Sequence, residues 1–165
     1  MTSDHQQGRP ATVTTPADRE IQIVREFAAP RDRVFAAYTD PALIPEWWGP
    51  RGTTTIVDVM DVRPGGQWRF VARDADGSET AFRGVYREVT EPERIVQTFE
   101  WEGMPGHVSV ETAEFEDLGE RTRVVTRSLF HTTEERDGML GSGMERGMNE
   151  TYARLDELLE RVAAR

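Results

Sequence analysis

The amino-acid sequence predicts an α+β fold in which a curved antiparallel sheet of about six to seven strands closes around a long C-terminal helix. The middle of the chain alternates apolar and polar residues, and turn sequences interrupt it at the spacing of hairpins. Near the C-terminus, apolar residues recur at spacings of three and four over positions 140–162. Together these patterns indicate a meander of strands followed by one amphipathic helix.

The first predicted strand covers Glu20–Phe27, where apolar and polar residues alternate. Further strands are expected at residues 53–62, 67–73, 80–89, 94–101, 107–116 and 122–131. The segments between the later strands are rich in Gly, Pro, Asp and Glu, which suits tight turns. Sequential strands joined by such short turns pair antiparallel, so the sequence predicts a meander.

Two short helices are expected after the first strand. Pro30 suits a first helical turn, and the residues after it carry an apolar stripe that includes Phe35. Asp40 then resembles an N-cap with Pro41 at the first helical position, and Gly49-Pro50 ends the second helix.

The C-terminal helix is predicted to run without interruption from Glu134 to Val162. Its second half is rich in Leu, whereas residues 138–148 hold several Gly and Met residues. Each glycine inside a helix costs roughly 1 kcal/mol relative to alanine, and Met packs adaptably. We therefore hypothesise that this softer half lies over a pocket mouth and acts as a gate. The alternative is a helix that begins near Met144, with the glycines in a loop.

A chain of 165 residues has the length of one domain. Residues 1–19 are polar and lack periodicity, so they are interpreted as a flexible N-terminal arm. Residues 20–165 are expected to form the single domain.

Composition excludes several classes of function. The net charge of −10 disfavours nucleic acid and anionic membranes as partners. All 20 basic residues are Arg, so Schiff-base lysines and Walker-type phosphate loops are excluded. The absence of Cys excludes thiol nucleophiles and disulfides. No apolar run of spanning length or signal-peptide pattern is present in the sequence, and a cytoplasmic location is the expectation.

Several motifs occur in the order typical of a known family. They are Pro30-x-x-x-Val34-Phe35, Trp47-Trp48-Gly49-Pro50, Asp61-x-Arg63-Pro64-Gly65-Gly66, Gly84-x-Tyr86-x-Glu88-Val89, Gly119-x-x-Thr122 and Gly147-Met148-Asn149-Glu150-x-Tyr152-x-x-Leu155-Asp156-x-Leu158. Over residues 21–159 the chain resembles the START-like (SRPBCC) superfamily, and within it the small bacterial proteins similar to the activator of Hsp90 ATPase (AHSA1-like). The resemblance implies a helix-grip (Bet v 1-like) fold and no particular function.

Aromatic side chains at alternating strand positions are predicted to face the helix across the concave side of the sheet. With them, Trp48 and three helix residues are expected to form a pocket for a small hydrophobic or aromatic molecule. The predicted ligand-binding residues are Trp48, Trp68, Phe70, Phe82, Tyr86, Phe99, Trp101, Phe115, Met144, Met148 and Tyr152. Each aromatic residue has an alternative role in core packing, and the tandem Trp47-Trp48 has one as a structural anchor.

Two other functions stay open. The first is an enzyme similar to polyketide aromatase/cyclases, and its candidate polar groups are Tyr86, Glu88, His107, Thr112 and Asn149. The second is an Hsp90-type co-chaperone or stress-response partner, which only the resemblance suggests. The leading expectation is a binding protein without catalytic residues, metal or cofactor, either monomeric or homodimeric. His107 and His131 lie far apart in sequence, which disfavours a zinc site.

Overall fold

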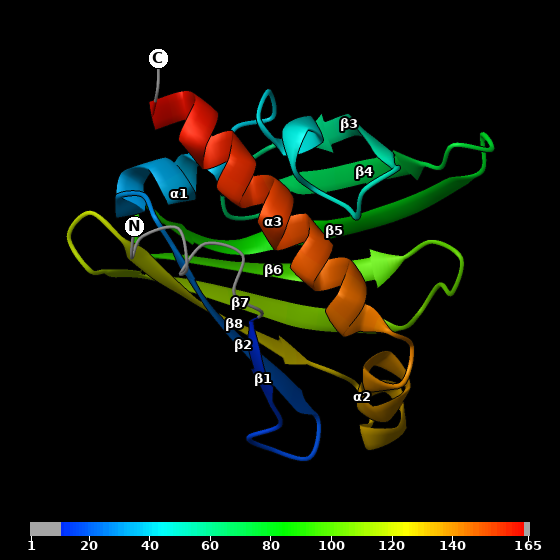
Figure 1. Ribbon diagram of the computed structural model, residues 1–165. Coiled ribbons are helices and arrows are strands. Elements are labelled where there is room, and N and C mark those ends of the chain that lie inside the picture. Colours follow the sequence, from blue (N-terminus) through cyan, green and yellow to red (C-terminus); the bar gives the residue numbers. More distant parts are fainter. Residues whose placement is uncertain (1–10, 164–165) are drawn as a thin grey trace.

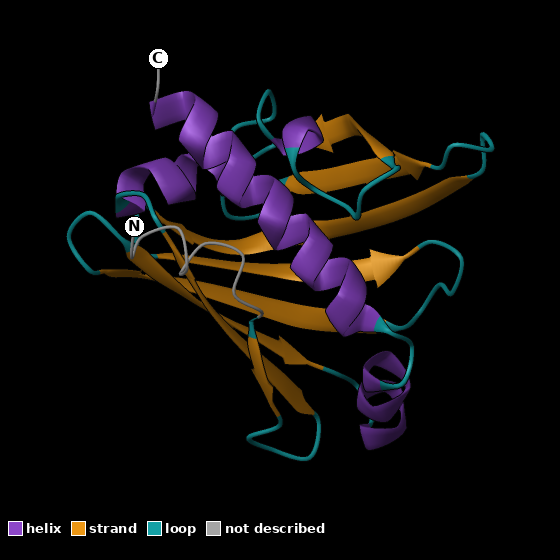
Figure 2. Ribbon diagram, viewed as in Figure 1, coloured by secondary structure: helices purple, strands orange, loops and turns teal. Residues whose placement is uncertain are grey.

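The computed structural model describes residues 11–163, which form one eight-stranded antiparallel sheet with α-helices at its concave face and at its ends (Figures 1 and 2). The strand order is β1-β2-β8-β7-β6-β5-β4-β3, so consecutive strands pair from β3 to β8 and β2 inserts between β1 and β8. The α+β prediction and the antiparallel meander are confirmed.

The strands follow the predicted segments closely. They are β1 (Thr12–Thr14), β2 (Glu20–Phe27), β3 (Thr54–Met60), β4 (Gln67–Arg73), β5 (Glu79–Thr90), β6 (Arg94–Trp101), β7 (Val108–Asp117) and β8 (Thr122–Leu129). The predicted count of six to seven strands is too low because β1 was placed in the N-terminal arm. Only three residues long, β1 gives no alternation to detect, and its pairing with β2 orders it. Residues 1–10 of the predicted arm lie outside the described residues.

The first of the two predicted short helices is present as α1 (Arg31–Thr39). The second is reduced to turns and a single 3-10 turn, η1 (Ile44–Glu46), so that prediction is wrong in helix type and length. Pro45 explains the difference, because it has no N–H with which to continue an α-helix begun at Pro41. The Asp40 carboxylate accepts a hydrogen bond from the Ala42 N–H at 2.9 Å, which stabilises the turn instead.

The C-terminal segment contains two helices rather than the single one predicted. They are α2 (Thr133–Leu140) and α3 (Met144–Ala163). Gly143 has a φ of +82°, a left-handed conformation that interrupts a right-handed helix and that glycine adopts without strain. The alternative start near Met144 is therefore correct for α3, although Gly138 belongs to α2.

Helix α3 crosses the concave face of the sheet diagonally, whereas α2 lies beyond one end of the sheet (Figure 1). Leu155 and Leu158 of α3 are at most 1% exposed and form the core with Phe27 and Val34. The C-terminal half of α3 therefore fastens the helix to the sheet.

A buried ion pair also joins α3 to β2. The Arg25 guanidinium donates to both carboxylate oxygens of Asp156 at 2.8 and 2.7 Å, and the two side chains are only 4% and 9% exposed. Arg25 also lies 4.8 Å from the centre of the Phe27 ring. This pair determines where the middle of α3 sits on the sheet.

Candidate ligand-binding cavity

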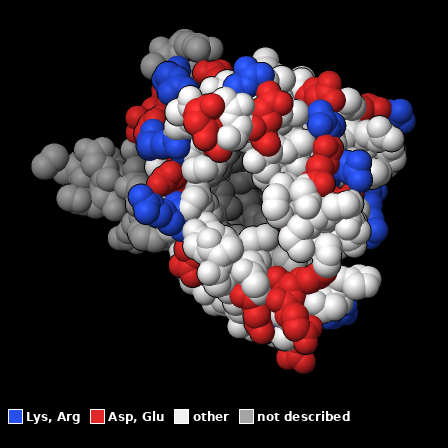
Figure 3. Space-filling view, turned by 90° about the vertical axis from the view of Figure 1, so that its right-hand side faces the viewer, with Lys and Arg blue, Asp and Glu red and all other residues white. Residues whose placement is uncertain are grey.

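A cavity of about 540 Å³ lies between the concave face of the sheet and the N-terminal half of α3. In the space-filling view, a hollow opens in the face that carries α2 and the β4–β5 and β6–β7 loops (Figure 3). The cavity exists because the strongly curved sheet meets α3 tightly only along the C-terminal half of the helix.

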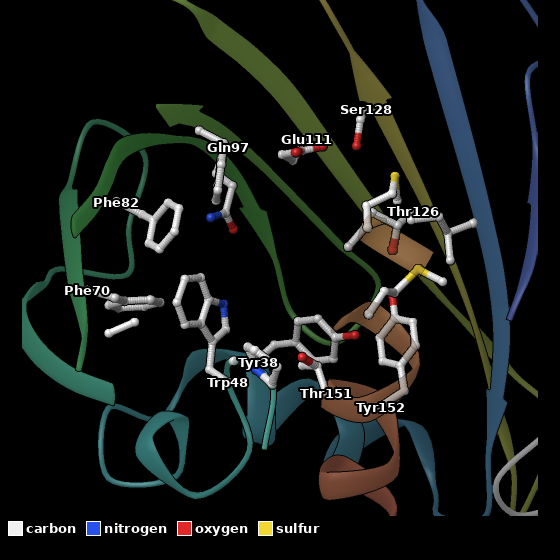
Figure 4. A pocket seen from close by; sticks show the side chains of 18 of the residues that line it. Tyr38, Trp48, Phe70, Phe82, Gln97, Glu111, Thr126, Ser128, Thr151 and Tyr152 are labelled. Carbon is white, nitrogen blue, oxygen red and sulfur yellow. The ribbon is translucent and has the colours of Figure 1, made fainter. Parts of the chain in front are cut away.

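Aromatic rings form one wall of the cavity. The Trp48 ring contacts Phe70 and Phe82 edge-on, with centroids 5.1 and 5.4 Å apart, and Phe82 lies 5.4 Å from Phe99. The neighbouring Trp47 has a different role, because its indole N–H donates to the Ala37 carbonyl at 3.0 Å and its side chain is buried. Both residues line the cavity, but Trp47 is also anchored by this hydrogen bond, whereas the Trp48 ring faces the cavity (Figure 4).

The structure brings eight of the eleven predicted ligand-binding residues together around the cavity. They are Trp48, Phe70, Phe82, Tyr86, Phe99, Met144, Met148 and Tyr152. Their contact with a ligand stays a prediction.

The other three predicted residues do not line the cavity. Trp68 is 1% exposed behind the wall, where its indole N–H donates to the Thr98 carbonyl at 3.1 Å. Phe115 packs against Phe35 with ring centroids 5.2 Å apart. Trp101 ends β6 and is 41% exposed, with its indole over Gly103. Alternation predicts the face of the sheet correctly but not how far along the strand the cavity reaches.

A row of polar side chains crosses the sheet on the same face, and of its members only Tyr86 was among the predicted site residues. Tyr86 pairs with Gln97, Gln97 with Glu111, and Glu111 with Ser128 across strands β5 to β8. All four line the cavity, and Figure 4 shows Gln97, Glu111 and Ser128 along one side of it. The period-two pattern that identified Phe115 as inward-facing also applies to Glu111, four residues earlier on β7, and that signal could have found it.

Glu111 is the charged member of this row. Its Oε1 accepts from the Ser109 hydroxyl at 3.4 Å, whereas Oε2 is buried without a hydrogen-bond partner among the described residues. Burial raises the pKa of Glu111 to about 7, and the hydroxyls of Ser128 and Ser109 oppose this rise only in part. The carboxyl group can therefore change its protonation near neutral pH.

A second polar group lies on the helix side of the cavity. The Tyr38 hydroxyl hydrogen-bonds to the Tyr152 hydroxyl, which also accepts from Thr126 (Figure 4). Burial raises the pKa of both tyrosines, so both stay protonated at neutral pH. Each phenol oxygen therefore takes part in a hydrogen bond, whereas Oε2 of Glu111 has no partner among the described residues.

The polar groups considered for an enzyme are not assembled into one site. Of these, only Tyr86 lines the cavity. Glu88 pairs with Arg94, Asn149 accepts from the Ala11 N–H, and His107 contacts Glu135 in α2. Within residues 11–163, no group of three or more His, Asp or Glu side chains is placed to hold a metal ion.

Methionines lie where the gate was expected. Met139 of α2 and Met144 and Met148 of α3 all line the cavity. No residue of α2 is buried, and two side chains within it, Glu135 and Arg136, hydrogen-bond to other parts of the chain. The pairing of Glu135 with His107 joins α2 to the β6–β7 loop.

If α2 and the start of α3 act as a gate, their amides should exchange with solvent faster than those of the Leu-rich half of α3. Local opening needs little free energy where few side chains are buried. Hydrogen exchange of the free protein, resolved for residues 139–148 and 152–160, measures this difference. Equally strong protection of both segments would show that the gate hypothesis is wrong.

A curved antiparallel sheet that grips a C-terminal helix over an internal cavity places the protein in the START-like class. A family model described as "Activator of Hsp90 ATPase homolog 1-like protein" matches residues 28–160, so the chain belongs to this AHSA1-like family. The resemblance found in the sequence is thereby confirmed.

Solved structures support the same fold. A protein from Rhodobacter sphaeroides is 25% identical, with a TM-score of 0.84 over 92% of this chain and 99% of that one. Protein Ms6760 from Mycobacterium smegmatis is 26% identical, with a TM-score of 0.81 over 91% and 97% of the two chains. An Hsp90 activator from Plasmodium falciparum, PFC0360w, is 19% identical with a TM-score of 0.54, over 74% and 87% of the chains, and shares the fold alone.

The search of curated proteins found no match to the chain. Among the described residues, no helix has the length and apolar character needed to cross a membrane.

Proposed function

We propose that this protein binds a small hydrophobic or aromatic molecule in the cavity between the sheet and α3. The observation that carries the proposal is a cavity of about 540 Å³ whose lining includes the rings of Trp48, Phe70, Phe82 and Phe99. Apolar surface that a ligand buries there contributes about 25 cal/mol per Å² before the costs of association are subtracted. Aromatic walls with a few polar groups are typical of small-molecule sites.

The direct test is native mass spectrometry of the purified protein, followed by extraction and identification of any bound compound. We expect a species heavier than the chain, which organic extraction converts to the mass of the chain alone. If the protein carries no adduct and also fails to bind the neutral apolar probe N-phenyl-1-naphthylamine, the proposal is wrong.

Filling the cavity should abolish binding without unfolding the protein. Met144 begins α3 beside the cavity and is only partly buried, so a tryptophan there can enter the cavity without displacing the core. We expect Met144→Trp to weaken binding of N-phenyl-1-naphthylamine by about tenfold or more, because the introduced indole ring and the probe compete for the same volume. Fluorescence titration of the probe measures this loss.

The matched control is Met104→Trp, the same substitution in the β6–β7 loop at a side chain that is 48% exposed and does not line the cavity. It should bind the probe like the unmodified protein. Phe70→Trp provides a second filling variant at the opposite wall, and unchanged binding in both filling variants would argue against the cavity as the site.

A further inference from the structure

We propose that the cavity selects a hydrophobic or aromatic amine, whose ammonium group pairs with the Glu111 carboxylate at the centre of the polar row. This inference rests on the proposed ligand-binding function and adds the chemical class of the ligand. Three features of the cavity, as residues 11–163 form it, support the inference: a buried acceptor without a partner, a lining without a neutralising cation, and walls that attract cations.

The first feature is the unsatisfied Glu111 Oε2. A buried polar atom without a hydrogen-bond partner is costly and uncommon in a folded protein, so it suggests that something else completes the site. The Gln97 side chain lies beside it in the row and has no hydrogen-bond partner among the described residues. A ligand with several N–H donors could therefore bond both the carboxylate and the Gln97 amide oxygen.

The second feature is the charge around Glu111. The described residues that line the cavity include no Arg or His, and the chain has no Lys. The titratable groups that face the cavity are the phenols of Tyr38 (α1), Tyr86 (β5) and Tyr152 (α3), together with Asp74 at its edge. Arg25 of β2 lies 5.8 Å from the centre of the Tyr152 ring, outside the lining, and forms a bidentate pair with Asp156 of α3. A cationic ligand would supply the charge that the Glu111 site lacks.

The third feature is the attraction of the cavity for cations. The faces of aromatic rings such as Trp48 and Phe82 attract an ammonium group that has lost its water. The net charge of −10 also favours the approach of a cation. A carboxylate ligand would be repelled by the Glu111 carboxylate, and a neutral alcohol would leave its charge uncompensated.

Three probes of one shape distinguish these ligand classes: 2-(1-naphthyl)ethylamine, 2-(1-naphthyl)ethanol and 1-naphthylacetate. Isothermal titration calorimetry at pH 8 should show that the amine binds about tenfold or more tighter than the alcohol, as expected for a hydrogen bond to a charged group. The negatively charged probe, 1-naphthylacetate, should bind most weakly of the three.

The Glu111→Gln variant keeps the shape of the side chain but removes its charge. We expect the preference for the amine over the alcohol to fall below about threefold in this variant. Glu114→Gln is the matched control, because it removes the same charge from the same strand on the opposite face, where Glu114 pairs with Arg127. It should keep the preference for the amine.

The pH dependence of the unmodified protein tests the proposal without any variant. Because the pKa of Glu111 is raised to about 7, its carboxylic acid group must lose a proton before it can pair with the ammonium group. Amine affinity should therefore be constant above about pH 8 and fall toward that of the alcohol, by about tenfold in total, as the Glu111 carboxylate becomes protonated below pH 7. A primary ammonium group stays charged throughout this range.

Equal affinities for the amine and the alcohol, tightest binding by the carboxylate, or an amine preference that survives Glu111→Gln would each overturn the proposal. Those results would leave the cavity as a binding site for a ligand of another class. If N-phenyl-1-naphthylamine and all three probes fail to bind, both this inference and the proposed function are wrong.

Discussion

Replacing Asp156 by alanine should lower the free energy of unfolding by about 3–5 kcal/mol, because it leaves the Arg25 guanidinium charged and without its carboxylate in the core. Arg25 is 5% exposed, so water cannot take the place of the carboxylate without opening the contact between α3 and β2. Denaturation in urea, followed by circular dichroism, measures this loss.

Two controls separate a buried charge from a general loss of contacts. In the double variant Arg25→Met with Asp156→Leu, both charges are absent, and stability should recover most of the loss. Glu79→Ala breaks the exposed pair with Arg73, whose side chains are about half exposed, and should cost less than about 1 kcal/mol. If Asp156→Ala costs no more than Glu79→Ala, the buried pair does not hold α3 in place.

The strands were predictable because the sheet has one face against the helix, and burial then alternates with a period of two. The bounds of β4 and β6 agree with the predicted segments to the residue. The same rule could not find β1, since this strand forms through its pairing with β2 and shows no pattern within its three residues.

The leading prediction of one uninterrupted C-terminal helix is wrong because apolar periodicity continues across the break, which only the alternative start near Met144 anticipated. Leu140 ends α2 and Met144 begins α3, and the spacing of four between them is that of one uninterrupted stripe. Periodicity reports which residues face the core but is blind to a positive φ such as that of Gly143. The pair of glycines around Ser142 was the better signal.

The aromatic part of the candidate site was predictable from alternation, whereas the polar part was not. Glu111 and Arg25 both occupy inward positions, yet one lines the cavity and the other is neutralised by a helix residue 131 positions away. Only the strand register shows that Glu111 stands beside Gln97 and Ser128. A charged residue at an inward position therefore indicates a candidate site residue, but only the tertiary structure shows whether another side chain neutralises its charge.

Gly84→Ala should be the second strongly destabilising change, with a loss of about 3 kcal/mol or more. A Cβ at this position would lie 1.9 Å from the Thr98 carbonyl oxygen and 2.5 Å from the Trp68 indole nitrogen. The first of these atoms is backbone of the paired strand β6, so the clash can be relieved only by separating β5 from β6.

The control is Gly138→Ala in α2, where a Cβ would meet nothing within 4 Å. That substitution should stabilise the protein, by up to about 1 kcal/mol, through helix propensity. The clash at Gly84 would also break the Trp68 hydrogen bond to Thr98, and Trp68 packs directly behind Phe70 and Phe99, with ring centroids 4.9 and 5.8 Å away. Gly84→Ala should therefore weaken binding of N-phenyl-1-naphthylamine even at temperatures where the variant is folded. A stable Gly84→Ala protein with unchanged probe affinity would contradict the close strand approach on which the cavity wall depends.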